Sequence, residues 1–205
     1  MIIGILDYGI GNIYSLKKFF FSKNIKFILI NSPNLISKCD KIILPGQGSF
    51  NHAIENINNN NYKEAIILHI DKGKFLLGIC LGMQLLMKKS HENGISDGLG
   101  IIDGEVKKIN FQNNYFPLPH IGWKKISITN AIDSNINTLV QNNYYYFAHS
   151  YFCEFNEKVE KTYTNYQNFR FISLFKKENI IGSQFHPELS SAQGYKFLEN
   201  FIYYE

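Results

Sequence analysis

The chain has 205 residues, of which 45% are hydrophobic and 19% are charged, so it can bury one sizeable core and does not have the composition of a disordered protein. Its formal net charge of +4 comes from Lys and Arg residues spread along the chain, which argues against a nucleic-acid-binding surface. The three cysteines, Cys39, Cys80 and Cys153, are far apart and form no C-x-x-C pair, so we expect free thiols rather than disulfides or a zinc site.

The N-terminal apolar run, MIIGIL, has no basic leader and is interrupted at Asp7. A signal peptide and a membrane span both need a longer apolar segment. We therefore expect a cytoplasmic protein that does not bind a membrane.

The first half of the chain alternates short apolar runs with helix-like stretches. We expect strands over 1–6, 26–31, 41–46 and 74–80 and helices over 13–24, 61–73 and 81–90. Strands that alternate with helices are typical of βαβ units, and unbroken apolar strands suit a parallel sheet covered on both faces. The Asn-rich run at 56–62 is expected to be a solvated loop. We predict one domain over 1–205 with a three-layer α/β core.

From about residue 99 the pattern changes to consecutive β-like runs. These runs cover 104–111, 124–129, 144–155, 169–175 and 180–187, with turns between them. We expect antiparallel or mixed strands that extend the first sheet or build a small second one, followed by a last helix over 190–204.

Cys80 is the first candidate for a reactive side chain, because it lies between Gly78 and Gly82 in the sequence LLGICLGMQLL. A G-x-C-x-G pattern between a strand and a helix is the thiol counterpart of the sharp turn that exposes a nucleophilic serine. The turn would place the sulfur at the N-terminus of the helix over 81–90, where the helix dipole favours a thiolate. On this local pattern alone, a buried structural cysteine remains the alternative.

A thiolate nucleophile usually needs a base, and the chain offers six histidines. We expect surface positions for His52, His69 and His91, and structural roles for His120 and His149, which have apolar neighbours.

His186 differs from these histidines because Pro187 and Glu188 follow it. In an extended segment Gln184, His186 and Glu188 would point to one face at a strand end. The carboxylate could then hold the imidazole in one tautomer and stabilise it after proton transfer.

Acyl transfer through a thioester also needs hydrogen-bond donors for the oxyanion. The backbone N–H of Leu81, directly after the nucleophile, is one candidate. The second should come from the loop after the strand over 41–46, where Gly46 and Gly48 allow the backbone amide of Gln47 to turn inward.

The three motifs PGQGSF, LLGICLGMQLL and QFHPE, in this order and at these separations, resemble those of the class I (triad) glutamine amidotransferases. Within that family the chain is similar to the glutaminase subunits of imidazole glycerol phosphate synthase. The narrower resemblance rests on ILDYGIGNIYSL, GLGIIDGEV, PLPHIGW and YYFAHSY. It implies a flavodoxin-like fold with a central, mostly parallel sheet flanked by helices and a β-rich C-terminal half.

The resemblance also implies an activity and its residues. Cys80 would attack the side-chain amide of glutamine, His186 would protonate the departing ammonia and then activate water, and Glu188 would orient His186. The implied substrate contacts are Gly48, Gln84, Ser150 and Tyr151. No metal or organic cofactor is implied.

A partner follows from the same resemblance, because the glutaminase pattern uses the whole length and leaves no room for an ammonia acceptor domain. The implied partner is a (β/α)8 barrel cyclase subunit that uses the ammonia in histidine biosynthesis, with Asn12 and Trp123 at the interface.

Two positions depart from the family pattern and keep alternatives open. Leu189 stands where the family usually has a basic residue, and Gln47 stands where it usually has an aliphatic one. A paralogous glutaminase that supplies ammonia for cell-surface sugar biosynthesis is the alternative function. A cysteine peptidase of the same architecture and a binding subunit with an inactive site are the other hypotheses.

Overall fold

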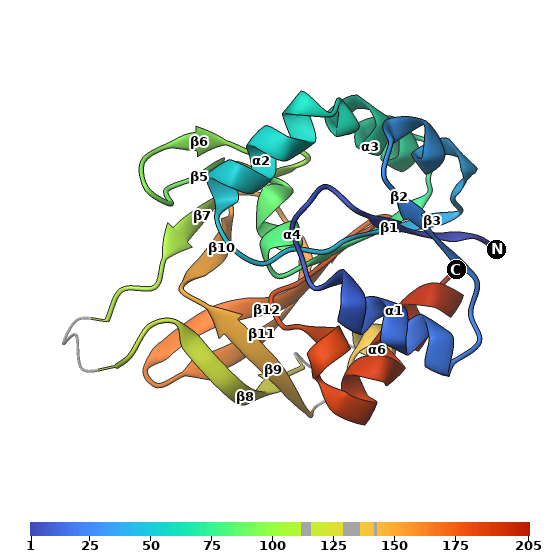
Figure 1. Ribbon diagram of the computed structural model, residues 1–205. Coiled ribbons are helices and arrows are strands. Elements are labelled where there is room, and N and C mark those ends of the chain that lie inside the picture. Colours follow the sequence, from blue (N-terminus) through green and yellow to red (C-terminus); the bar gives the residue numbers. More distant parts are fainter. Residues whose placement is uncertain (112–115, 129–135, 142) are drawn as a thin grey trace.

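The structure is a computed structural model that describes residues 1–111, 116–128, 136–141 and 143–205 (Figure 1). Helices and strands alternate along the first half of the chain: β1 (Ile3–Leu6), α1 (Ile13–Ser22), β2 (Phe27–Ile30), the 3₁₀ helix η1 (Pro33–Lys38), β3 (Lys41–Leu44), α2 (Phe50–Asn59), α3 (Tyr62–Asp71), β4 (Phe75–Ile79) and α4 (Leu81–Leu85). The four strands expected in this half are confirmed.

The second half is rich in strands, as expected. It contains β5 (Met87–Ser90), β6 (Ser96–Asp97), β7 (Ile102–Lys108), β8 (His120–Ser127), α5 (Ile136–Leu139), β9 (Tyr144–His149), β10 (Tyr151–Phe155), β11 (Glu160–Tyr166), β12 (Phe169–Lys177), β13 (Ile180–Ser183), the 3₁₀ helix η2 (Pro187–Leu189) and α6 (Ser191–Tyr203). The expected strand over 124–129 corresponds to the end of β8, and its last residue lies outside the described residues.

Most strands belong to one large sheet with the order β2-β1-β3-β4-β13-β12-β11-β8-β9. The pairings from β2 to β13 are parallel and those from β13 to β9 are antiparallel. A smaller sheet has the order β10-β7-β5-β6. The β-rich second half therefore both extends the first sheet and builds a second one.

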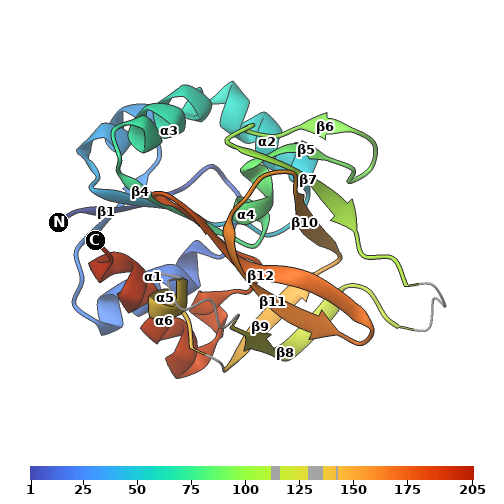
Figure 2. The same cartoon turned by 180° about the vertical axis from the view of Figure 1, so that it is seen from behind.

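Helices cover both faces of the parallel strands, which gives the expected three layers (Figure 1). Side chains alternate along each strand, so Leu6 and Leu76 pack toward α2 and α3, whereas Ile5 and Leu77 pack toward α1 and α6. The N- and C-termini lie close together at the other end of the sheet from β9 (Figure 2).

The helix expected over 81–90 is wrong in its second half. The chain leaves the helix after Leu85, and Met87 begins strand β5. The backbone carbonyls of Leu85 and Leu86 accept hydrogen bonds from Leu99 and Ile102 at 2.8 and 2.9 Å. Pairing with a segment later in the chain therefore overrides a local pattern that suits a helix.

The loop expected at 56–62 is wrong for most of its length, because 56–59 end α2 and Tyr62 begins α3; residues 60 and 61 form an exposed turn between the two helices. The buried residues of α2 are Phe50, Ala53, Ile54 and Ile57, which have helical spacing. The many asparagines lie on the solvent side of this pattern and obscure it.

The run over 144–155, expected as one strand, is divided at Ser150 into β9 of the large sheet and β10 of the small sheet. Strand β9 contributes to the position of the candidate site. The antiparallel strands curve back, so that β9, the last strand in the order, meets the segment that follows β13. His186 N–H donates to the Tyr146 carbonyl at 2.9 Å.

No helix among the residues that the structure describes is long and apolar enough to cross a membrane.

Adjacent phenylalanines of α1 test the packing of this helix on the sheet. Phe20 is fully buried and Phe21 is 73% exposed. We expect Phe20→Ala to lower the free energy of unfolding by about 3–5 kcal/mol, because it leaves a cavity between α1 and the sheet. The matched variant Phe21→Ala should cost less than about 1 kcal/mol. Equal losses in a urea titration would contradict this packing.

Candidate active site

The candidate site lies where the neighbouring parallel strands β4 and β13 end. Their register pairs Ile79 with Ser183, so Cys80 and Gln184 follow at the same edge of the sheet. Cys80 N–H donates to the Ser183 carbonyl at 2.7 Å. The carboxyl ends of parallel strands are the usual position for sites in such folds. This pairing brings together residues that are far apart in the sequence.

Cys80 occupies a tight turn with φ of +51° and ψ of −105°. A non-glycine residue in this region costs on the order of 1–3 kcal/mol and persists only where the surroundings hold it. The flanking glycines provide that hold: a Cβ on Gly82 would lie 1.9 Å from the Leu44 carbonyl oxygen, and one on Gly78 would lie 2.8 Å from the Gly82 backbone. The first turn of α4 therefore packs directly on β3 and β4.

The helix after Cys80 is shorter than expected, with five residues instead of ten. A short helix has few aligned peptide dipoles, so α4 stabilises a thiolate less than the sequence suggested.

His186 and Glu188 form the expected pair, with 2.8 Å between His186 Nδ1 and Glu188 Oε1. Both side chains are buried. Strand β13 ends at Ser183, and the extended backbone that we expected through Glu188 stops at His186, because Pro187–Leu189 forms η2. The carboxylate therefore reaches the imidazole through one turn of 3₁₀ helix, and not through the two-residue repeat of a strand.

The imidazole of His186 carries a strongly perturbed pKa. Burial alone would lower it, but the charge of Cys80 and hydrogen bonds with Cys80 and Glu188 outweigh burial and raise the pKa well above its usual value. The sulfur and the carboxylate therefore both favour the protonated form of the His186 imidazole.

The loop after β3 packs against the turn at Cys80. A Cβ on Gly46 would lie 2.8 Å from both the Leu81 Cβ and the Gly82 nitrogen, so only glycine allows this approach. Gln47 and Gly48 follow as exposed residues, and Gly48 has φ of +106°. The loop is thus in the expected neighbourhood of Leu81; donation of the Gln47 amide to an oxyanion stays a prediction.

Gln84 is buried one turn beyond Cys80. Its Nε2 donates to the Tyr151 carbonyl at 3.2 Å and to Gln184 Oε1 at 3.1 Å, which uses both of its N–H groups. Within the described part of the chain no group donates to its Oε1. A substrate could therefore meet Gln84 as an acceptor. The half-buried Ser150 precedes Tyr151 at the bend between β9 and β10.

Glu92 lies close to this group and was not singled out from the sequence. Its carboxylate accepts a hydrogen bond from Phe50 N–H at 3.3 Å; the pKa of Tyr151 is raised by burial first and by the charge of Glu92 second. Burial also raises the pKa of Glu92 itself. Glu92 follows β5 in a turn, and no local motif marks it; only the fold brings it near Tyr151.

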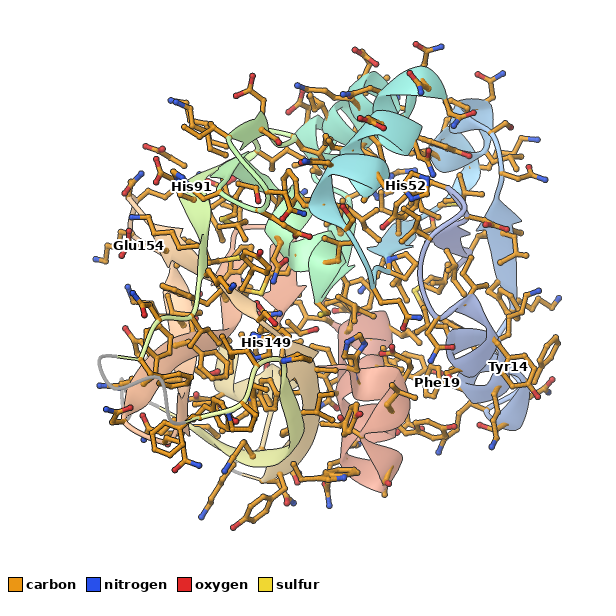
Figure 3. The ribbon with its side chains drawn as sticks, turned by 60° about the vertical axis from the view of Figure 1, so that its left-hand side comes forward. Tyr14, Phe19, His52, His91, His149 and Glu154 are labelled. Carbon is orange, nitrogen blue, oxygen red and sulfur yellow. The ribbon has the colours of Figure 1, made fainter. Side chains whose placement is uncertain are left out.

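Besides His186, three other histidines among the described residues are buried. The surface position expected for His69 is wrong: its side chain lies on the buried face of α3, and its Nε2 is 3.2 Å from the Phe75 carbonyl. His120 and His149 are buried as expected, and Figure 3 shows His149 in the interior. Their rings are 3.2 Å apart, between His120 Nδ1 and His149 Nε2, and His149 Nδ1 lies 2.8 Å from the Tyr151 carbonyl.

The two residues expected at a partner interface lie on the surface in different settings. The Asn12 side chain caps α1, since its Oδ1 accepts from Ser15 N–H at 3.2 Å. Trp123 is 45% exposed and packs edge-on against Tyr146. It shares the outer face of β8 and β9 with Ile121 and Tyr144, which are also exposed.

Among the residues that the structure describes, no group of three or more His, Cys, Asp or Glu side chains could hold a metal ion.

The chain is similar to known proteins over nearly its whole length. The family model described as glutamine amidotransferase class-I matches residues 4–204. The imidazole glycerol phosphate synthase subunit HisH of Bacillus subtilis strain 168 is 36% identical over 202 residues, covering 97% of this chain and 94% of that protein. Subunit HisH 2 of Methanococcus maripaludis strain S2 is 42% identical over 205 residues, covering 98% of each.

Solved structures show the same fold at low identity. The structure of PurLQS from Thermotoga maritima has a TM-score of 0.73 at 14% identity, covering 99% of this chain and 98% of that chain. A crystal structure of a glutamine amidotransferase has a TM-score of 0.74 at 16% identity, covering 98% and 96%.

The buried histidine pair gives a prediction for the acid range. Burial lowers the pKa of His120 to about 4 and that of His149 to about 3. Unfolded imidazoles bind protons below about pH 6.5, so the pair makes the folded state lose stability as the pH falls below that value. We expect ¹⁵N NMR at a pH of about 5.5 to show both rings neutral. A cationic ring at either position would contradict their burial.

Proposed function

Because the chain belongs to the class I glutamine amidotransferase family, we propose that Cys80, His186 and Glu188 are the catalytic triad of a glutaminase. The single observation that carries this proposal is the convergence of the three side chains at the ends of β4 and β13, with His186 2.8 Å from Glu188 and its pKa raised by Cys80. The chain acts as the glutaminase subunit of imidazole glycerol phosphate synthase, hydrolysing glutamine to glutamate and ammonia, which passes to a cyclase subunit.

The reaction follows from the positions of the charges. The Cys80 thiolate attacks the amide carbon of the substrate, and the carbonyl electron pair moves to the oxygen. His186 gives its proton to the departing ammonia as the C–N bond breaks and a thioester forms. The neutral imidazole then takes a proton from water, which attacks the thioester and releases glutamate. Glu188 holds the ring and stabilises its cationic form.

The oxyanion that forms in both steps needs two donors. The backbone N–H groups of Leu81 and Gln47 are our candidates. The close packing of Gly46 on the turn at Leu81 and Gly82 supports this assignment, because it brings the two backbone segments together.

Glutamine also carries an ammonium and a carboxylate that the site must recognise. The free Oε1 of Gln84 and the carboxylate of Glu92 are acceptors that suit the ammonium. Gly48, with no side chain above the loop, and the bend at Ser150 and Tyr151 complete the proposed substrate pocket.

A cyclase subunit is the proposed partner, and we expect it to be a (β/α)8 barrel in the cytoplasm. The relatives named as subunits of imidazole glycerol phosphate synthase support a complex. The exposed face of β8 and β9, which carries Ile121, Trp123 and Tyr144, is the proposed docking surface with Asn12. Exposed aromatic side chains that lie together are typical of binding surfaces. Leu189, 37% exposed, adds apolar area where a basic residue was expected.

Substitution of the nucleophile tests the activity. We expect Cys80→Ala, assayed with the cyclase partner, to lower the rate of glutamate release by about 10⁴- to 10⁶-fold, because no other group can form the thioester. Cys39→Ala is the matched control, since Cys39 is buried before β3 and its thiol donates to the Leu35 carbonyl at 3.3 Å. It should keep its activity. More than a tenth of the activity in Cys80→Ala would refute the proposal.

A second substitution tests the docking surface. Trp123→Ala should raise the Kd for the cyclase by about 30-fold, as expected when a large aromatic side chain is lost from an interface. Tyr203→Ala removes an exposed aromatic side chain from the end of α6 and should leave the Kd unchanged. Titration calorimetry or a pull-down series can measure both. Equal affinities for Trp123→Ala and the unmodified chain would place docking elsewhere.

A further inference from the structure

Gln184 lies directly beside the proposed nucleophile. Its side chain is fully buried, and its Nε2 is 3.6 Å from the sulfur of Cys80. On its other side, Gln184 Oε1 accepts a hydrogen bond from Gln84 Nε2 at 3.1 Å. The amide of Gln184 therefore bridges the helix after the nucleophile and the nucleophile itself.

The direction of these hydrogen bonds can be deduced from the chemistry of the groups. The Tyr151 backbone carbonyl can only accept, so Gln84 must present its NH₂ group to it. That NH₂ group also faces Gln184, which must then present its carbonyl oxygen. The NH₂ group of Gln184 is left to face the sulfur, and Cys80 receives a donor from Gln184 rather than an acceptor.

The Tyr151 carbonyl is itself held by a second donor. His149 Nδ1 lies 2.8 Å from it, so this nitrogen carries the hydrogen and Nε2 is the acceptor. His120 Nδ1, 3.2 Å away, must then donate to that Nε2. Both rings are neutral, in keeping with their lowered pKa values, and His120 Nε2 is left as an acceptor to which no described residue donates.

On the basis of the proposed function, we propose that Gln184 is a catalytic residue that donates a hydrogen bond to the Cys80 sulfur and stabilises the thiolate, and that His149 is a positioning residue that orients this donor through Tyr151 and Gln84. The step balances without a further reactant. The thiol proton moves to His186, and the negative charge left on sulfur accepts the N–H of Gln184.

The other close neighbour of the sulfur explains why such a donor is needed. The carbonyl oxygen of Ala148 lies 4.0 Å from the sulfur, on the side of β9. This oxygen can accept from a thiol but faces a thiolate with its negative end. With a helix of only five residues behind Cys80, the Gln184 amide and the His186 imidazolium are the groups that favour the charged sulfur.

The titratable groups around the sulfur come from four segments. His186 and Glu188 follow β13, His149 lies on β9, Cys153 on β10 and Tyr8 after β1. Burial raises the pKa values of Tyr8 and Cys153 and lowers that of His149, so these three groups keep one protonation state near neutral pH. A change of thiol reactivity in that range therefore reports on Cys80 and the triad.

Gln184→Met tests the donor, because it keeps the length of the side chain and removes the N–H. The readout is the rate of alkylation of Cys80 by iodoacetamide as a function of pH, with labelling followed on the Cys80 peptide so that Cys39 and Cys153 do not contribute. One hydrogen bond to a charged group is worth about tenfold or more. We expect the midpoint of the alkylation profile to rise by about one pH unit.

Catalysis should change in the same variant, with kcat about 10- to 100-fold lower and KM within about threefold, since the bond acts on the nucleophile and not on substrate binding. Gln141→Met, on an exposed glutamine before β9, is the control and should leave both readouts unchanged. Gln184→Leu serves as the second variant if thermal unfolding shows that the methionine variant is not folded. An unchanged alkylation midpoint in a folded variant overturns the proposal.

The positioning role has its own test in a pair of variants. The amide N–H of His149→Asn can replace the Nδ1–H donor to the Tyr151 carbonyl, whereas His149→Phe cannot. We expect the asparagine variant to keep the alkylation midpoint of the unmodified chain and the phenylalanine variant to raise it. Identical midpoints in the two folded variants would reject the role of His149.

These outcomes are separable from those that concern the proposed function. Alkylation by iodoacetamide needs neither glutamine nor a partner, so it reports on the hydrogen bond alone. If the unmodified chain releases no ammonia from glutamine in the presence of the cyclase, the proposed function fails whatever the alkylation profile. If it releases ammonia and Gln184→Met alkylates with an unchanged profile, only the inference fails.

Discussion

The parallel pairing of β4 with β13 is the constraint on which the site depends. It places the end of a strand near residue 79 beside the end of a strand near residue 183, with Cys80 N–H bonded to the Ser183 carbonyl. The proposed nucleophile and its base therefore belong to two strand ends whose separation is set by backbone hydrogen bonds. Such an arrangement is stiffer than one built on free loops. It can therefore hold the reacting side chains in a fixed geometry around a small substrate.

Two kinds of contact surround this pairing: close approaches of backbone segments at glycines, and hydrogen bonds between buried polar side chains. Three backbone segments approach one another closely at Gly46, Gly78 and Gly82. Their contacts hold Cys80 in its conformation with positive φ. Behind the turn, the amides of Gln84 and Gln184 share a hydrogen bond, and Gln84 also donates to the Tyr151 carbonyl. This buried network of hydrogen bonds orients the Gln184 amide toward the Cys80 sulfur.

The differences between expectation and structure share a physical cause. At Met87 a pattern that suits a helix becomes a strand because distant backbone groups at 99–102 supply the hydrogen bonds. At Ile57 a helix forms in an Asn-rich run because one apolar face packs on the sheet. His69 is buried because it lies on the face of α3 that packs against the start of β4 at Phe75. In each case tertiary contacts outweigh local composition.

By itself the sequence determined the three-layer α/β core, the position of Cys80 in a sharp turn between a strand and a helix, and the pairing of His186 with Glu188, because each leaves a local signal in glycine spacing, apolar runs or neighbouring residues. Only the tertiary structure decided how short the helix after Cys80 is, that Glu92 stands near Tyr151, and that Gln184 turns its NH₂ group toward the sulfur. The physical reason is that these features depend on hydrogen bonds between residues up to about a hundred positions apart, whose partners no local pattern identifies.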